Sequence, residues 1–330
     1  MFDYEARKIR NKFLASILIV LFGVAPSISY ALPGDWAVYQ DTNGTFDTNV
    51  TSFTGVPFNS QLQQDSVFTQ AGDDVAVELG EDGLYLACYN VYGYNDTYAN
   101  RMGWRARLRD DSAGTNWTGG WSSNYRRDAN NDQFGIQGCG FLNASSGDDV
   151  EVQVQELSSN SASHLILANF SHLFLLQLDD YWDYIQLTSS AGQSVSTSFQ
   201  DIQWDTLVGS SGSSITHSTV TDNDTITLED GTYLFVYNVS TTASGTSNER
   251  TSITSTVLRN GTVEMPYAFD YAYVRNTDNL GNGDTNRAFL YRTNTPPEDI
   301  TIRFSAEFAY SAGGQTVTPD TSLSIIKLPD

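Results

Sequence analysis

The sequence predicts an all-β protein made of two tandem antiparallel β-sandwiches, and its alternating apolar pattern is the first reason. The runs Val150 to Val154 and Ile300 to Phe304 alternate strictly between apolar and polar residues. A period of two indicates strands with one buried face. Turn signals such as Asn43-Gly44 and Asn260-Gly261 separate the short runs, and such dipeptides are typical of antiparallel hairpins.

An internal duplication is the second reason. The segment DGLYLACYNV at 82–91 returns as DGTYLFVYNV at 230–239, and SHLFLLQLDD at 171–180 returns as TSLSIIKLPD at 321–330. The two displacements are 148 and 150 residues, in the same order along the chain. A period this long indicates two complete domains, since repeat arrays have units of about 20–50 residues.

The N-terminal segment has the features of a secretory leader. Four basic residues precede an apolar run from Leu14 to Ala25, and Ser29-Tyr30-Ala31 provides small residues at the −3 and −1 positions. This order predicts a signal peptide at 1–31. The alternative is a membrane anchor, but a span needs about 20 apolar residues. We therefore expect no transmembrane segment in the mature chain, an extracellular or cell-surface location, and domains at 32–180 (the first copy) and 181–330 (the second copy).

The charge of the chain disfavours polyanionic partners. The sequence holds 17 Lys and Arg residues against 39 Asp and Glu residues, a net charge of −22. Removal of the leader takes away four basic and two acidic side chains, which leaves 13 against 37 and a net charge of −24. A surface this acidic repels nucleic acid and anionic lipid. We therefore expect no nucleic-acid partner.

The two cysteines, Cys88 and Cys139, both lie in the first copy, each in a strand-like context. In a secreted protein an even pair favours a disulfide. The alternative is two buried free thiols, which are common in protein cores. Because the second copy has no cysteine and folds without one, any disulfide is an accessory to the fold.

Each copy has the size and strand content of a jelly-roll sandwich, about 150 residues with about eight strands. Gly83-Leu84-Tyr85 and Gly231-Thr232-Tyr233 begin a strand in the middle of each copy, and Leu328-Pro329-Asp330 closes the second copy. With the turn Gly147-Asp148-Asp149-Val150, these segments resemble the C1q/TNF-like domain over most of both copies. The chain departs from that family in having no collagen-like stem and no coiled-coil heptads.

The resemblance implies self-association, because members of that family usually assemble as trimers through aromatic-rich sheet faces. We therefore expect a homo-oligomer, either a trimer or a filament. Aromatic residues of the repeated strand are candidates for this contact, and the alternative is that they fill the two cores. These residues are Tyr85, Tyr89, Tyr233, Phe235 and Tyr237.

The chain lacks the sequence patterns of an enzyme. Its three histidines, His164, His172 and His217, have no cysteine or carboxylate at metal-ligand spacing, and the sequence contains no nucleophile elbow, P-loop or dinucleotide fingerprint. A duplicated enzyme would normally repeat its catalytic residues, and none of these histidines recurs in the other copy. We expect a non-enzymatic protein without catalytic residues.

Acidic loops provide one candidate cofactor site, for calcium. Oxygen-rich loops occur at equivalent places in the two copies, and calcium prefers oxygen ligands. Neither loop completes an EF-hand, and the alternative is an Asx-rich turn on a solvated surface. The candidate ligands are Asp128 and Asp132 in the first copy and Asp278, Asn282 and Asp284 in the second.

Three tryptophans distinguish the first copy from the second. Trp104, Trp117 and Trp121 cluster around a glycine-rich loop, and the second copy has no tryptophan there. This asymmetry favours either a site for a glycan or a surface protein on the first copy or a difference in packing. Two functions follow: a secreted structural protein that forms trimers or filaments at a cell or virion surface, or an adhesin-like binding module. The duplication favours the first, because two linked copies offer two faces for assembly.

Overall fold

The structure, a computed structural model, is built of strands throughout the part of the chain that it describes. None of the described segments forms a helix long and apolar enough to cross a membrane. The expected leader at 1–31, the junction at 179–182 and three calcium candidates (Asp128, Asp132 and Asp278) lie outside the described residues. The described ranges are 35–44, 52–95, 102–126, 133–157, 164–166, 170–178, 183–190, 192–243, 250–265, 268–275, 282–307 and 314–328.

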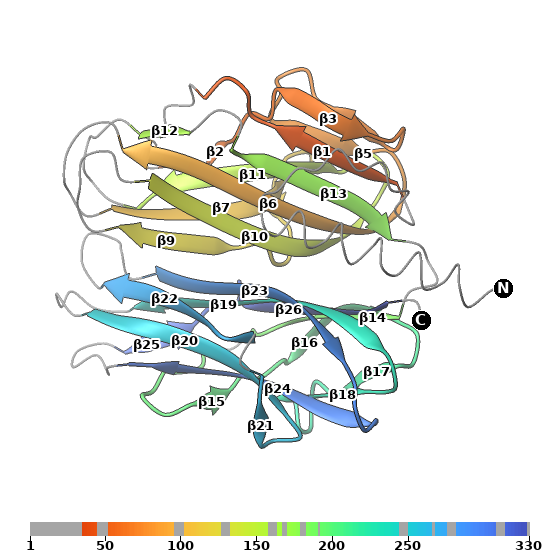
Figure 1. The fold of residues 1–330 in the computed structure, drawn as a ribbon, viewed down its shortest axis with the longest axis vertical. Helices are drawn as coiled ribbons and strands as arrows, with labels where there is room; N and C mark the ends of the chain where they lie inside the picture. The colour runs from red at the N-terminus through yellow and green to blue at the C-terminus, as the bar shows by residue number, and fades with distance from the viewer. Residues whose placement is uncertain are drawn as a thin grey trace.

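The first copy forms a sandwich of two antiparallel sheets (Figure 1). The first sheet has the order β10 (Gln133–Ala144), β6 (Gly83–Asn95), β13 (His172–Leu178), β1 (Trp36–Gln40) and β3 (Ser60–Gln64), with β12 (His164–Ile166) paired to β6. The second sheet has the order β4 (Phe68–Gln70), β5 (Ala76–Leu79), β11 (Asp149–Glu156), β7 (Met102–Asp110) and β8 (Thr115–Asn116), with β2 (Thr54–Gly55) paired to β11 and β9 (Ser122–Arg126) paired to β7.

The chain passes between these sheets in the manner of a jelly roll. It leaves β5 in the second sheet for β6 in the first, returns to β7, pairs β7 with β9, and then crosses through β10 and β11 to β13. Neighbours within a sheet are therefore distant in sequence, as where β6 lies between β10 and β13. Jelly-roll sandwiches have this connectivity.

The second copy repeats the same strand order. Its first sheet has the order β16 (Thr206–Ser211), β14 (Tyr184–Thr188), β26 (Ser322–Leu328), β19 (Thr232–Ala243) and β23 (Asn282–Arg292), with β25 (Gln315–Val317) paired to β19. Its second sheet has the order β17 (Ile215–His217), β18 (Thr225–Leu228), β24 (Glu298–Ala306), β20 (Arg250–Arg259) and β21 (Val263–Glu264), with β15 (Gln200–Asp201) paired to β24 and β22 (Asp270–Arg275) paired to β20. The predicted fold class, all-β with two tandem antiparallel sandwiches, is confirmed.

Each sandwich encloses its own apolar core, and the two cores repeat in detail. The hydroxyl of Tyr89 donates to the carbonyl oxygen of Gly120 at 2.6 Å, and that of Tyr237 donates to the carbonyl oxygen of Ala268 at 2.6 Å. The five aromatic residues singled out in the sequence are at most 3 % exposed and belong to these cores. Because these side chains fill the space between the two sheets of each sandwich, they do not lie on an outer face where another domain could dock. They are Tyr85, Tyr89, Tyr233, Phe235 and Tyr237.

Candidate functional site at the interface between the copies

The two sandwiches pack against each other with an edge of the first on a sheet face of the second (Figure 1). Strand β9 of the first copy contacts β23 and β22 of the second, and β10 contacts β23. Gln186 of β14 donates from Nε2 to the carbonyl oxygen of Phe141 at 2.7 Å. Asn286 of β23 donates from Nδ2 to the carbonyl oxygen of Trp121 at 3.1 Å. Both bonds run from side chains on the face of the second copy to the backbone at the edge of the first.

An ion pair around Arg105 of β7 joins the copies. Its guanidinium lies 3.1 Å from a carboxylate oxygen of Asp284 and 3.1 Å from one of Asp320, and it donates to Oγ of Ser240 at 2.9 Å. The side chain of Arg105 is 12 % exposed and that of Asp284 is completely buried. Burial lowers the pKa of Arg105, but the two carboxylates together raise it by more than burial lowers it. The pKa of Arg105 therefore lies above its ordinary value. Because the cation and its counter-charges come from different copies, the ion pair links the two sandwiches directly.

The ring of Trp121 packs against the guanidinium of Arg105. The Arg105 Cζ atom lies 4.0 Å from the centre of the Trp121 ring, a cation–π distance. The tryptophan is 4 % exposed. Next to it, the backbone N–H of Asp284 donates to Oγ of Ser123 at 2.9 Å. The edge of the first copy thus presents an arginine, a tryptophan and a serine to the second copy.

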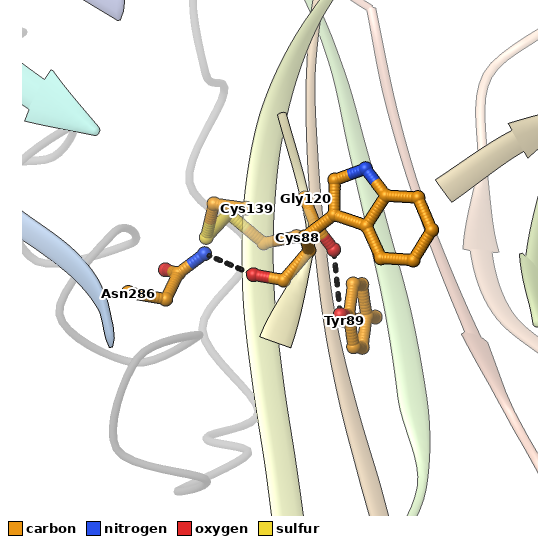
Figure 2. Close-up of a disulfide and its surroundings, with 6 residues drawn as sticks. Cys88, Tyr89, Gly120, Cys139 and Asn286 are labelled. Carbon is orange, nitrogen blue, oxygen red and sulfur yellow. Dashed lines mark hydrogen bonds between the residues drawn. A yellow bond between two sulfur atoms is a disulfide. The ribbon is translucent and has the colours of Figure 1, made fainter. Parts of the chain in front are cut away.

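An apolar cluster crosses the same interface and contains the disulfide. It includes Phe141 of the first copy and Leu234 and Val236 of the second. Cys88 and Cys139 belong to this cluster, lie directly opposite each other on β6 and β10, and are joined by a disulfide. Figure 2 shows Asn286 of the second copy beside the disulfide and the Tyr89–Gly120 hydrogen bond on its other side. The disulfide therefore links β6 to β10, the strand that contacts the second copy.

The three tryptophans do not form one exposed surface. Trp104 is 0 % exposed in the core of the first copy, and Trp121 lies in the interface. Trp117 packs partly buried against the core and donates from Nε1 to the carbonyl oxygen of Asp149 at 2.9 Å. In place of a shared ligand-binding surface, the structure gives each ring a packing role, because a large apolar ring gains more from burial than from exposure.

The calcium candidates are only partly described. Asp284 lies inside the interface, where Arg105 and Ser240 contact its carboxylate. Asn282 begins β23. Among the described residues, no group of three or more His, Cys, Asp or Glu side chains could hold a metal ion.

The residues that join the copies belong to no motif of the sequence. Arg105 and Asn286 are single polar residues within strands, and Asp320 lies in the turn before β26. The available signal was the difference between the copies at matching positions. Arg105 lies opposite Ser123 on β7 and β9, and the corresponding pair on β20 and β22 is Thr254 and Tyr271. A basic residue in one copy and a neutral residue at the matching position of the other indicate that this position makes different contacts in the two copies.

Glu151, away from this interface on β11, makes stability depend on pH. It is 6 % exposed, and burial, with a smaller contribution from Asp111, raises its pKa to about 7. A carboxyl whose pKa is raised on folding contributes stability below its unfolded pKa, and this is lost as pH rises through 7. We expect Glu151→Gln to gain about 2 kcal/mol relative to the natural protein between pH 5 and pH 8. Urea unfolding at both pH values tests this, with exposed Glu229→Gln as the control; an equal response of the two variants would contradict it.

Comparisons with known proteins find only distant structural likenesses. No family model matches the chain, and no curated protein sequence matches it. Murine APRIL in a crystal structure at pH 8.5 is 15 % identical, with a match covering 44 % of this chain and 99 % of that one and a TM-score of 0.32. Eiger TNF from S. frugiperda is 13 % identical, covering 45 % and 95 %, with a TM-score of 0.31. Each match spans less than half of this chain.

Proposed function

We propose that this protein is an extracellular, non-enzymatic structural protein whose chain is one rigid two-domain block that assembles with further copies of itself. The observation that carries the proposal is the interface between the two copies. It combines an apolar cluster, a buried ion pair and hydrogen bonds to strand edges. Interfaces of this kind hold domains in a fixed relation, whereas flexible binding modules are joined by small polar contacts.

The way the copies meet favours assembly beyond one chain. An edge of one copy rests on a face of the other, so the contact is heterologous. A heterologous contact uses two different surfaces and leaves one of each kind unused at the ends of the pair. Because both domains have the same fold, the second copy has an edge and the first copy has a face that correspond to the two surfaces already used.

An extracellular location agrees with three features of the chain. The sequence begins with the pattern of a secretory leader, the disulfide suits an oxidising compartment, and the strong negative charge keeps an exported protein soluble.

The mass of the mature chain in solution tests the proposal. We expect Leu32 to Asp330, measured by light scattering on a sizing column over a hundredfold range of concentration, to have a mass of several chains. The same measurement with calcium and with a chelator shows whether the acidic loops contribute to assembly. A single-chain mass at every concentration, with and without calcium, would contradict the proposed function.

A further inference from the structure

The edge of the second copy around β22, a strand that also contacts β9 of the first copy, carries exposed aromatic side chains. Phe269 is 44 % exposed and Tyr271 is 67 % exposed, and Val263 nearby is 45 % exposed. We infer that this edge docks on the outer sheet face of the first copy of a second chain, around Tyr92 and Phe170, and so joins chains head to tail. This inference rests on the proposed function and names the two surfaces and the partner.

The edge of the second copy corresponds residue by residue to the edge that is buried inside the chain. Phe269 follows Ala268 as Trp121 follows Gly120, and Ala268 and Gly120 accept the same tyrosine hydrogen bond in the two copies. Tyr271 lies opposite Thr254 as Ser123 lies opposite Arg105. The following residues therefore correspond: Trp121 and Phe269, Ser123 and Tyr271, Arg105 and Thr254.

The face of the first copy corresponds in the same way to the face that receives Arg105. The backbone N–H of Tyr92 donates to Oγ of Ser171 at 3.0 Å, and that of Ser240 donates to Oγ1 of Thr321 at 3.0 Å. Phe170 and Asp320 directly precede these two hydroxyl residues. Gly135 pairs with Tyr92 as Asp284 pairs with Ser240. The correspondences are Tyr92 with Ser240, Gly135 with Asp284, and Phe170 with Asp320.

The chemistry of the two surfaces changes together. Inside the chain, an arginine on the edge meets two acids and a serine on the face. On the unused pair of surfaces, the arginine is replaced by Thr254, and the acids are replaced by Gly135 and Phe170. The rings of Tyr92 and Phe170 lie 6.0 Å apart, centre to centre, on this face. Aromatic side chains on the second-copy edge can pack against aromatic side chains on the first-copy face, as the arginine of the first-copy edge pairs with the acids of the second-copy face.

Mismatched pairings are unfavourable for a definite reason. If the edge of a first copy docked on the face of another first copy, Arg105 would be buried against Phe170 with no carboxylate to pair with it. The edge of the second copy on the acidic face would bury Asp284 with no cation. Each leaves a buried charge unpaired, which is strongly unfavourable. The charges therefore favour packing of the first-copy edge on the second-copy face within a chain. They leave the second-copy edge available for the first-copy face of another chain.

At Phe170, Phe269 and Tyr271 the two surfaces are open within one chain, while Phe174 and Leu176 farther along the same face of β13 are at most 4 % exposed. Tyr271 and Phe269 are exposed, and Phe170 is 57 % exposed. The two surfaces therefore do not meet inside a single molecule, and their contact joins two molecules. Because the contact is heterologous, repeated use gives a ring or an open filament.

Two variants with complementary defects test the inference. Tyr271→Ser places the residue of the first copy on the edge of the second and leaves the first-copy face intact. Phe170→Asp places the acid of the second copy on the face of the first and leaves the second-copy edge intact. We expect each variant to raise the dissociation constant for self-association about thirtyfold or more, the effect of losing a central aromatic contact. Both positions are exposed, and circular dichroism with thermal unfolding checks that each variant is folded.

Mixing the two variants gives the decisive readout. Phe170→Asp keeps a working edge and Tyr271→Ser keeps a working face, so the mixture should form a two-chain species that neither variant forms alone. Val220→Asp, at an 86 % exposed position of the second copy, is the control and should assemble like the natural chain. If the natural chain is an oligomer and both variants keep its size, the head-to-tail inference is wrong and the proposed function stands. If the natural chain is a monomer throughout, the proposed function fails as well.

Discussion

Replacing Arg105 with alanine is expected to destabilise the packing of the two copies by about 3–5 kcal/mol, the usual cost of removing one partner from a buried ion pair. The variant leaves the fully buried carboxylate of Asp284 without its cation, and burial already raises the pKa of Asp320, the other partner. It also removes the group that rests on the Trp121 ring. Urea unfolding measures the loss, and hydrogen exchange at the Asp284 amide, which donates to Ser123, shows whether the interface is the part that opens.

Arg292→Ala is the matched control for this prediction. Arg292 pairs with Asp230 at 3.1 Å within the second copy, with side chains 50 % and 65 % exposed. Exposed pairs contribute about 0–1 kcal/mol, so this variant should unfold close to the natural protein. Equal losses in Arg105→Ala and Arg292→Ala would show that the pair between the copies is worth no more than a surface pair and that the interface does not depend on it.

Removal of the disulfide gives the second large effect. The bond closes a sequence separation of 51 residues, and a constraint of that length stabilises a folded protein by about 2–4 kcal/mol, chiefly by restricting the unfolded chain. The informative replacement is Cys88→Val with Cys139→Ala, because the second copy has Val236 opposite Ala288 at the matching place. We expect this double variant to unfold in urea like the reduced natural protein and at lower urea than the oxidised one.

A second replacement separates the covalent bond from the packing around it. Cys88→Ser with Cys139→Ser removes the same bond but places two hydroxyls in the apolar cluster between the copies. It should therefore be less stable than the valine–alanine variant, since buried hydroxyls without partners are unfavourable. If the valine–alanine variant unfolds at the same urea concentration as the oxidised natural protein, the disulfide contributes nothing to stability.

The fold was predictable because its signals are local or repeated. Strict alternation at Val150 to Val154 indicates one buried face, and those valines do lie in the core of the first copy. The displacement of 148 residues between repeated segments is matched by the recurring Tyr89 and Tyr237 hydrogen bonds. Strand pattern and duplication together specify two equal sandwiches without any knowledge of which surfaces meet.

The role of the repeated aromatic strand could not be decided from its pattern. In β19, Tyr233, Phe235 and Tyr237 enter the core while Leu234 and Val236 belong to the cluster between the copies. Both faces of this strand are buried, so the alternation of apolar and polar residues that would reveal the inner face is absent. A strand of this kind gives no internal sign of which of its residues reach a neighbouring domain.

The interface was hidden because its partners are remote in the chain. Arg105 is 179 residues from Asp284 and 215 from Asp320, and no spacing rule connects them. The tryptophans illustrate the same limit, since the composition of a strand does not distinguish a ring that fills a core, as Trp104 does, from one that contacts a ligand. Only the comparison of matching positions in the two copies would have revealed the changed charges.

Electron microscopy of the assembled natural protein tests the account most directly, because it shows how neighbouring chains are related. We expect the second copy of one chain to contact the first copy of the next with Tyr271 near Tyr92 and Phe170, in the same edge-on-face arrangement that Arg105 and Asp284 make inside each chain. Every domain would then be related to the next by nearly the same rotation. Chains that meet through identical surfaces about a two-fold axis, or through β3 and β16, would contradict it.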